Sequence, residues 1–583
     1  DGVESLAVFN HFLGAPTVNR WRSELQEIAI ILGQLPLAVA IAAGRLAAHM
    51  TVPDYLAQLR EADNRLDSLI REDRSIRLSF DLSYRLLSPQ LQPFFASLGA
   101  FGGDDFSVEA AAYVAGTAET DALRFLNELI QLSLVQPGRA ERYSLHPLLR
   151  DFAREKQPGT QVSQRMVDWF VKFAAKHTAD YAEVGGELSN LRFALATAQD
   201  MQLNHSFING VLDVFPTWRI RGDMATAVPY LKTAFTMAQT IGNRGYQARL
   251  LSFLGITAWV SGKPQESEAY HQQGLTLAYA VEDANLIAKF LIDLGSVAGG
   301  YYGDYNQAKT YLLEAATYMQ QATHPEHGAS LFLTLGNVAY EQGDWREAEQ
   351  YWHEGLEHDD RYGRTNSASI SLRRNLGVLA MVQGRFDTAN THLNKTLALA
   401  RHLNAAETIS STLSILGQVA TEQADYTRAQ ALLEEALFVA REINASESIA
   451  QALINLGQCA ANSGATSVAA NHFQEALTVT QDADLTWLAA TGHIYRGEMH
   501  LKTGETFAAR QDFTTALETA VALKAPEQKA AALFGLARTS FPDDRGQAIR
   551  YAQESVAIFD ELGHFSAASV HQWLNDNAQT VTG

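Results

Sequence analysis

The residues that could carry out catalysis stand in this sequence without the neighbours that catalysis requires. The loop GxxxxGK[ST], which cradles phosphates with backbone N–H groups and a lysine, does not occur. Gly262-Lys263-Pro264 departs from that pattern, and Asp359-Asp360 follows a helical segment instead of the apolar strand that precedes a Walker B acid. No Ser-His-Asp or Cys-His set can be argued from spacing. The sequence therefore predicts that this chain is not an enzyme.

The seventeen histidines and the single cysteine do not form a metal site by their spacing. His324 and His327 lie close together but would need further ligands from elsewhere to hold zinc. His392 and His472 take a position that tyrosines occupy in other copies of a repeat, so packing accounts for them. Cys459 occupies a small-residue position. One cysteine excludes a disulfide framework and fits a reducing compartment.

The strongest pattern in the sequence is a repeated helical hairpin. The run LGNVAYEQGDWREAEQYWHEGL, residues 335–356, places Leu-Gly in a first helix, turns at Gly343, and puts Ala348 on the inner face of a second helix. The arrangement recurs at steps of 39 to 41 residues. A fixed period of this kind is typical of a solenoid, whose units cannot bury their apolar faces alone. We count nine hairpins, with turns at Gly222, Gly262, Gly303, Gly343, Gly384, Ala424, Gly464, Gly504 and Asp543.

The order LG…G-x-[aromatic]-x-x-A…[AG]-L resembles the tetratricopeptide repeat, with longer helices than the usual 34-residue unit. The resemblance implies that residues 205–583 form a right-handed α-solenoid of about nine extended repeats, a sensor domain whose first helices line a concave groove. Projecting that register gives a set of predicted groove residues, which would bind a peptide or small molecule. They are Arg249, Trp259, Lys289, Asn337, Tyr340, Arg374, Gln418, Gln458 and Glu498.

The predicted groove residues include cations and two aromatic rings, which would suit an anionic or hydroxyl-rich ligand. An ordinary solvated helix face is the alternative. The segment Gly299-Gly300-Tyr301-Tyr302-Gly303 carries one inserted residue. It would either distort the solenoid to shape a pocket or be tolerated as a plain insertion.

Residues 1–70 are predicted to form a small helical domain. A helix ends at Gly33, and Pro36 suits the first turn of the next helix, Leu37 to Met50, which is apolar nearly all round and so should be buried. The segment LGQLPLAVAIAAGRL resembles the GLPL motif of the NB-ARC class of signal-transduction ATPases, the STAND proteins. In that family the proline, here Pro36, packs near the adenine of the nucleotide. By residue type alone the segment is a helix-turn-helix.

Residues 71–157 are predicted to form a winged-helix domain. Ser88-Pro89 should start a helix, and Leu134-Val135 and Arg142–Leu145 should pair as a hairpin before another helix. YSLHPLLRDFA then resembles the MHD motif that closes this domain in NB-ARC proteins, where a histidine contacts the β-phosphate of ADP. The matching residue is His146. Pro147 replaces the usual Asp, so one carboxylate of the resting state is missing. The alternative is that His146 only packs at a helix N-terminus.

Charge argues against DNA binding by such a winged helix. Residues 71–156 contain ten Arg or Lys and twelve Asp or Glu, and the whole chain has a formal charge of −20, whereas DNA-binding modules are usually basic on one face. No run of eighteen apolar residues and no signal peptide occur. We therefore expect a cytoplasmic protein with no membrane or direct nucleic-acid partner. Since it begins at Asp1 and not at Met, we expect a fragment of a longer chain.

The two motifs and the repeats together resemble the regulatory and sensor part of a bacterial STAND ATPase, similar to the MalT-like regulators. Residues 158–204, with GGELSNLRFALATA, resemble the helical linker of that family. The resemblance implies that the winged helix holds the ADP state against the nucleotide-binding domain of the same parent chain. An inducer on the repeats would release it, permitting ATP exchange and oligomerisation. No cofactor is expected in this chain itself; ADP or ATP with Mg would belong to the parent. The alternative is a repeat scaffold for partner proteins, capped by the first 156 residues.

Overall fold

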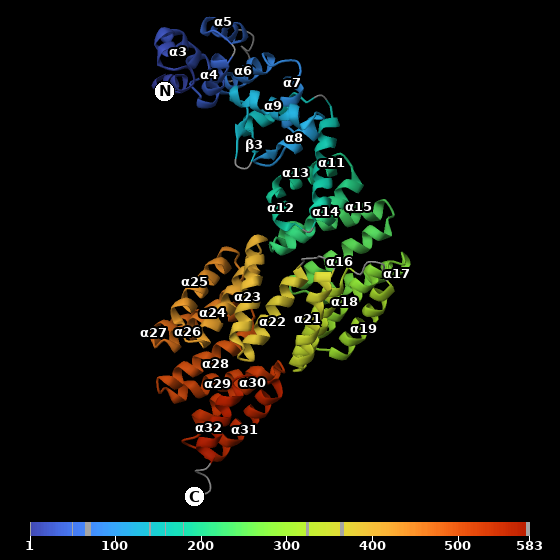
Figure 1. The fold of residues 1–583 in the computed structure, drawn as a ribbon, viewed down its shortest axis with the longest axis vertical. Coiled ribbons are helices and arrows are strands. Elements are labelled where there is room, and N and C mark those ends of the chain that lie inside the picture. Colours follow the sequence, from blue (N-terminus) through green and yellow to red (C-terminus); the bar gives the residue numbers. More distant parts are fainter. Residues whose placement is uncertain are drawn as a thin grey trace. The chain divides into compact units, whose positions relative to one another are not determined.

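The computed structural model describes residues 2–48, 50–63, 71–138, 141–157, 159–178, 180–321, 326–361 and 367–578. These ranges are almost entirely helical, with three short strands in the first third of the chain (Figure 1). The chain divides into two compact units. The first contains residues 1–178 and 183–214, and the second contains residues 179–182 and 215–583. Residues 64–70 of the predicted helical domain and His324 of the considered zinc pair lie outside the described ranges.

The first unit begins with a helical bundle around an apolar helix, as predicted. Helix α4 (Pro36–Ala48) starts at Pro36 and buries Val39, Ala42 and Ala43 completely. The preceding helix ends before Gly33, whose φ of +66° needs the freedom of glycine. The surrounding helices are α1 (Gly2–Leu13), α2 (Ala15–Arg20), α3 (Arg22–Ile31), α5 (Val52–Asp63) and α6 (Arg71–Arg85).

The next elements follow the order of a winged helix. They are α7 (Leu91–Leu98), β1 (Phe106–Ser107), α8 (Val108–Ala115), α9 (Glu119–Gln131), β2 (Gln136–Pro137), β3 (Arg142–Ser144) and α10 (Pro147–Glu155). The three strands form an antiparallel sheet in the order β1-β3-β2.

Three details of this domain differ from the prediction. Leu134 and Val135 precede β2, because Ser133 turns the chain with φ +58° and both apolar side chains are buried in the core. Strand β1 was not predicted, since two residues carry no period. Helix α7 begins at Leu91, later than predicted, because the Ser88 hydroxyl accepts from the backbone N–H of Leu91 in a turn that precedes the helix.

Most of the predicted linker belongs to the first unit, and residues 179–182 belong to the second. The linker contains α11 (Gln161–Lys176), α12 (Tyr181–Gly186) and α13 (Leu188–Asp200). The side chain of Asn190 on α13 is 2% exposed. It accepts from the Gly103 N–H at 2.7 Å and donates to the Asp105 carbonyl at 2.9 Å. These bonds fix α13 to the loop before β1.

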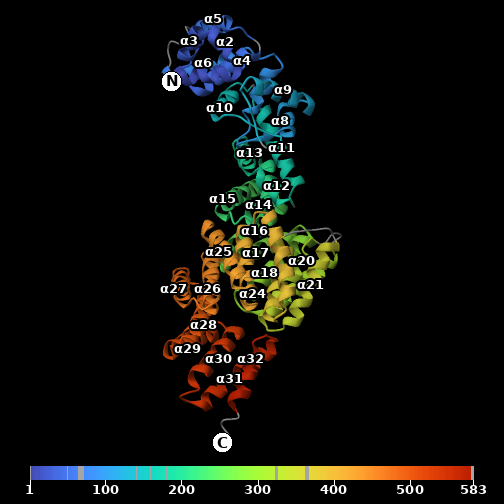
Figure 2. The same cartoon turned by 60° about the vertical axis from the view of Figure 1, so that its left-hand side comes forward.

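The second unit contains the predicted solenoid except for residues 205–214, which belong to the first unit. Nine helix pairs, α14/α15 to α30/α31, follow one another through the described ranges, and a final helix, α32, follows them (Figures 1 and 2). The helices are α14 (Asn204–Ile220), α15 (Met224–Thr240), α16 (Arg244–Val260), α17 (Pro264–Ala280), α18 (Ala284–Gly300), α19 (Tyr305–Gln321), α20 (Gly328–Glu341), α21 (Trp345–Arg361), α22 (Ser367–Val382), α23 (Phe386–His402), α24 (Ala406–Glu422), α25 (Tyr426–Glu442), α26 (Ser446–Asn462), α27 (Thr466–Asp482), α28 (Thr486–Lys502), α29 (Thr506–Ala522), α30 (Pro526–Ser540), α31 (Arg545–Leu562) and α32 (Ala567–Ala578).

In seven of the described hairpins, α16/α17 to α28/α29, a glycine of the first helix faces a large side chain of the second. A Cβ added to Gly336 on α20 would lie 2.3 Å from Nε1 of Trp352 on α21, so only glycine lets these two helices approach. The predicted inner-face residue Ala348 is fully buried. Eight of the nine predicted turn residues have positive φ, including Ala424 at +60°. Asp543 does not have a positive φ. In this last turn Phe541 keeps right-handed helical angles, so α30 does not end on a left-handed residue.

None of the helices in the described ranges is long and apolar enough to cross a bilayer. Within the same ranges, no three His, Cys, Asp or Glu side chains lie close enough together to hold a metal ion. Cys459 is buried, which raises the pKa of its thiol. The burial agrees with the packing role inferred for this residue.

Candidate functional site

The first helices of neighbouring pairs pack against one another, α24 on α26 and α26 on α28, and so form one continuous face of the solenoid. The predicted groove residues lie on these helices. Arg249 and Trp259 are on α16, Lys289 on α18, Asn337 and Tyr340 on α20, Arg374 on α22, Gln418 on α24, Gln458 on α26 and Glu498 on α28. That they bind a ligand remains a prediction.

Most polar groups of this face already bind their neighbours in the next repeat. The Asn375 side chain donates to the Asn337 carbonyl oxygen at 2.9 Å. The Gln458 amide donates to Glu422 at 3.0 Å, and only 8% of the Gln458 residue is exposed. The guanidinium of Arg538 donates to both carboxylate oxygens of Glu498. These groups form a polar ladder that stabilises the repeat stack.

The charges of the predicted groove differ from those expected. The ammonium of Lys289 lies 2.5 Å from the Asp293 carboxylate, so its charge is neutralised within α18. Burial lowers the pKa of Arg374, while the carboxylates of Glu407 and Glu447 oppose that shift. Burial also raises the pKa of Glu422 and Glu447. With these carboxylates present, the charges give little support to an anionic ligand.

The glycine-tyrosine insertion is absorbed by the turn after α18. The Asp304 N–H reaches back to the Ala298 carbonyl at 2.8 Å, whereas the equivalent Asp344 N–H reaches one residue less far, to Ala339. Trp259 is 38% exposed, and its ring lies 3.3 Å from the position of a Cβ on Gly300. The insertion thus makes room for an exposed indole.

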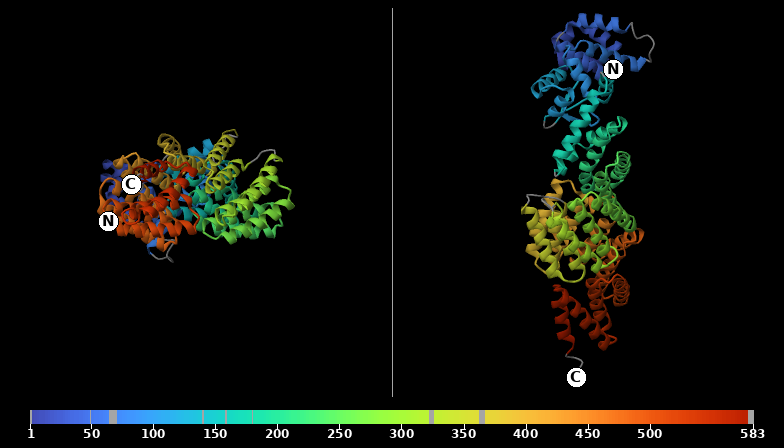
Figure 3. Two further views of the ribbon diagram at one scale, coloured as in Figure 1. Left: turned by 90° about the horizontal axis from the view of Figure 1, so that it is seen from below. Right: turned by 90° about the vertical axis from the view of Figure 1, so that its right-hand side faces the viewer.

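The solenoid closes on itself, which the sequence did not predict. The loop between α31 and α32 meets the turn between α22 and α23, where the Phe565 N–H donates to the Val382 carbonyl at 3.0 Å. The rings of Phe565 and Phe386 lie 6.1 Å apart. Leu562 packs at Gly343. We call this contact the seam; in Figure 3 the red final helices adjoin the ends of the yellow helices.

Two carboxyl groups with raised pKa lie beside the seam. Glu527, in the first turn of α30, keeps 40% of its side chain exposed, yet the surrounding protein and the charge of Glu341 raise its pKa to about 7. The surrounding protein likewise raises the pKa of Glu341, the last residue of α20, although this residue is exposed at the surface. Tyr340 stacks on Trp345 at 5.5 Å, and its phenol has a raised pKa because of burial and both carboxylates.

The two residues matched to nucleotide-contacting motifs lie at helix N-termini of the first unit. Pro36 is the first residue of α4 and is exposed. His146 is the N-cap of α10, and its Nδ1 accepts from the Leu148 N–H at 3.3 Å. In that tautomer Nε2 carries the proton, and the ring is partly exposed. The cap explains why a histidine fits before Pro147.

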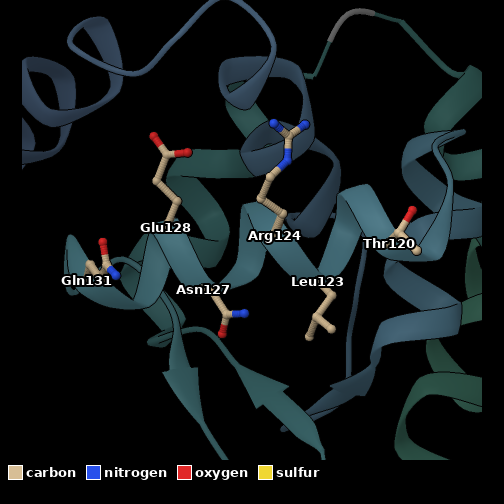
Figure 4. Close-up of a pocket in the computed structure, with 6 residues that line it drawn as sticks. All are labelled: Thr120, Leu123, Arg124, Asn127, Glu128 and Gln131. Atoms are coloured by element: carbon tan, nitrogen blue, oxygen red, sulfur yellow. The ribbon is translucent and has the colours of Figure 1, made fainter.

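Helix α9 of the first unit has an exposed face that includes Leu123, Arg124 and Asn127. A shallow pocket runs along it (Figure 4), lined by Thr120, Leu123, Arg124, Asn127, Glu128 and Gln131. Arg124 is the one cation among these six residues, and its guanidinium lies 2.9 Å from Asp121. This face offers no surplus of positive charge to the DNA-binding alternative.

The fold defines the second unit as a helical repeat protein, and comparison with known proteins specifies the repeat. The tetratricopeptide repeat model matches residues 329–402, 366–440 and 408–482. The chain is 26% identical to Regulatory protein AfsR of Streptomyces griseus over 394 residues, which are 60% of this chain and 40% of that protein. It is 36% identical to Regulatory protein AfsR of Streptomyces coelicolor over 153 residues, 26% of this chain and 15% of that one.

Among solved structures, the chain is similar to a STAND protein with a tetratricopeptide repeat sensor from Pyrococcus horikoshii. The match has 13% identity and a TM-score of 0.37, and covers 92% of this chain and 74% of that chain. The present chain spans about two fifths or less of the curated relatives it matches. It carries tetratricopeptide repeats and is similar to regulatory proteins.

Proposed function

We propose that this chain is the regulatory and sensor region of a cytoplasmic STAND-type signal-transduction ATPase. The observation that carries the proposal is the division into two compact units, one with the winged-helix order of elements and one with tetratricopeptide repeats. The similarity to proteins named as regulatory supports it. The first unit would hold the resting state, and the repeats would bind an inducer, either a peptide, a protein or a small molecule.

His146 is the residue of this chain that we propose to act on bound ADP. Its Nδ1 is used by the α10 cap, so Nε2–H is left to donate to a phosphate oxygen, and the start of a helix favours negative charge. The Nε2–H of His146 and the N-terminus of α10 would together suit the β-phosphate of ADP. When bound, ADP with Mg would supply the negative charge that the cap recognises. The nucleotide-binding domain would be a partner within the same parent chain.

Inducer binding would act as a shift between two states. A ligand can shift such an equilibrium only by its difference in affinity for the two states. An inducer that prefers the released state would therefore weaken the hold of His146 on ADP. ATP exchange and oligomerisation would follow in the parent protein.

Nucleotide release from the full-length parent tests this proposal. Two variants separate the roles of His146, since His146→Asn replaces the Nδ1 acceptor of the cap by an amide oxygen and His146→Ala removes the acceptor. Both should release fluorescent ADP faster and raise basal activity, because both lack the Nε2 donor. If only His146→Ala changes release, the residue acts through helix stability. If neither changes it, His146 has no part in the mechanism.

A scaffold for partner proteins is the second candidate, favoured by the polar ladder that already occupies much of the inner face. The sequence upstream of this chain separates the two candidates most simply. A Walker A motif there supports the switch, and its absence in the complete gene product supports the scaffold.

A further inference from the structure

One hairpin of the repeats, α28/α29, carries charged and polar groups at positions that are apolar in other hairpins. Its glycine, Gly497, faces Phe513 of the second helix. In the six hairpins from α16/α17 to α26/α27, a leucine precedes the equivalent glycine and an alanine follows it three residues later. In α28 these two positions are Arg496 and His500. Among these seven hairpins, the replacement is therefore specific to α28/α29.

The polar side chains of α28 converge on one buried carboxylate of α29. The side chain of Asp512 is 4% exposed. His493 Nδ1 lies 2.8 Å from its Oδ1, and His500 Nδ1 lies 3.0 Å from its Oδ2. The Arg496 guanidinium donates to both oxygens, at 2.6 Å and 3.1 Å. Burial alone would raise the pKa of Asp512, but the bonds from His493 and Arg496 hold it below its usual range. We call these four side chains the polar network.

The apolar core of the repeats is interrupted at the same hairpin. Among the described residues, one continuous cluster of buried apolar side chains extends from Ala329 on α20 to Leu488, near the start of α28. A separate cluster begins at Ala530 on α30. Between them, buried apolar residues of α28 and α29 fall into three small clusters, which contain Met499, Ile494 and Phe513. The polar network therefore lies where the apolar core is thinnest.

The helices that follow, α30 to α32, are attached to the rest of the repeats on two sides. On one side, Arg538 of α30 donates to Glu498 of α28 at 2.9 Å. On the other side is the seam, where the Phe565 N–H donates to the Val382 carbonyl. Leu562 extends the apolar cluster of the middle repeats to the seam. A change in α28/α29 should therefore be transmitted to the seam through α30 to α32.

Separating α28 from α29 should cost less free energy than separating the helices of an apolar hairpin. In an apolar hairpin, separation exposes leucine and alanine side chains to water, which is unfavourable. In α28/α29, separation returns a carboxylate, a guanidinium and two imidazoles to water, which solvates them. Water already reaches the edge of the polar network, because the side chains of His493 and Arg496 are 21% and 24% exposed. Apolar residues in place of a buried ion pair are often neutral or stabilising.

We propose that hairpin α28/α29 is a hinge, which opens before its neighbours and in opening releases α30 to α32 from the seam. In the closed form Asp512 binds three successive turns of α28, and Phe565 binds Val382. In the open form both sets of bonds are broken together. A ligand that prefers one form would shift the balance between them. This hinge goes beyond the proposed nucleotide switch and does not depend on it.

Native-state hydrogen exchange on the whole chain, measured at increasing urea, tests the hinge. The central amides of α28 and α29 and the Phe565 amide should open in one step with one dependence on urea. They should exchange at least about tenfold faster than the central amides of α26 and α27, whose core is apolar. Equal protection of the two hairpins would overturn the proposal. So would a Phe565 amide that opens in a different step from α28/α29.

A fourfold variant tests whether the polar network makes this hairpin the hinge. It places the residues of α24/α25 at the equivalent positions of α28/α29, through the substitutions His493→Leu, Arg496→Leu, His500→Ala and Asp512→Leu. Exchange in α28/α29 and at Phe565 should slow together by at least about tenfold. Faster exchange in the variant would mean that the network stabilises the hairpin, and would overturn the proposal. Slower exchange in α28/α29 with Phe565 unchanged would also overturn it.

An exposed ion pair provides the matched control. Arg441 of α25 and Glu475 of α27 lie 2.6 Å apart on the surface, and Arg441→Leu with Glu475→Leu should leave exchange in α28/α29 and at Phe565 unchanged. If the fourfold variant does not fold, the comparison of α28/α29 with α26/α27 in the parent chain decides. Nucleotide release is read in neither experiment, so the hinge and the proposed function can fail separately.

Discussion

The backbone N–H of Phe565 donates to the carbonyl of Val382 at 3.0 Å, and this bond joins the last hairpin of the repeats to a hairpin in their middle. A solenoid normally touches itself only between neighbouring repeats. Here the contact joins the last hairpin to a hairpin four repeats earlier in the chain. Glu341 and Glu527 lie beside this contact, whereas the predicted groove residues are mostly cationic, amide or aromatic.

The seam should be measurable through a pair of turn glycines. Gly384 and Gly464 both have positive φ, at +74° and +88°, but a Cβ on Gly384 would lie 3.2 Å from Phe565 whereas one on Gly464 meets nothing within 4 Å. Alanine at either position costs about 1 kcal/mol of backbone strain. Gly384→Ala should lose about 1 kcal/mol more, because Phe565 must shift to make room for the new methyl group. Urea denaturation of both variants measures the difference, and equal losses would mean that the seam is open in solution.

The stability of the seam should also depend on pH. One group should lower this stability as pH rises, and another should lower it as pH falls. The pKa of Glu527 is raised from 4.5 to about 7, so its contribution to stability is lost as pH rises through that window. The pKa of His564 is lowered from 6.5 to about 4 by burial, so its contribution is lost as pH falls from about 6.5 to 4.

Hydrogen exchange at the Phe565 amide measures this response. Compared with the parent at each pH, Glu527→Gln should protect the amide better at pH 8 and equally near pH 4. His564→Phe should increase the protection of the Phe565 amide near pH 4 and leave it nearly unchanged above pH 7. The same protection ratio at every pH for both variants would contradict this assignment.

The glycine before each turn should be a strict size constraint. Gly336→Ala would bring a Cβ within 2.3 Å of Trp352, whereas Gly295→Ala would meet Leu312 at 3.0 Å. We expect a loss of about 1–3 kcal/mol for Gly336→Ala and a smaller loss for Gly295→Ala. Trp352→Leu should reduce the cost of Gly336→Ala in a double-mutant cycle, since it removes the ring that the new methyl group meets. Strict additivity in chemical denaturation would contradict the predicted contact.

Asn190 should be a stability determinant of the first unit. Asn190→Ala would leave the Gly103 N–H, the Asp105 carbonyl and the Glu187 carboxylate without their bonds from this side chain. Because these groups are mostly buried, we expect a loss of about 2–4 kcal/mol. Asn127→Ala, at an exposed position on α9, should change stability by less than about 0.5 kcal/mol. Thermal denaturation of the two variants provides the comparison.

The sequence by itself determined the repeats, because their signals are local. Gly336 and Trp352 lie in one hairpin, and the turn glycines need positive φ. Because each unit packs on the next, the pattern within one period predicts the whole array of repeats. The buried helix α4 and the start of α10 after His146 were predictable for the same reason. The short strand β1 was not, since it pairs with β3 and has no pattern of its own.

Only the tertiary structure decided where the solenoid meets itself. The path of a solenoid accumulates from small rotations at every repeat, so no residue near Val382 encodes its contact with Phe565. The same accumulation decided that His564 lies against both Trp345 of α21 and Glu527 of α30. Register identified the helices that line the inner face, but the balance of charge on that face depends on which turns of the solenoid come together.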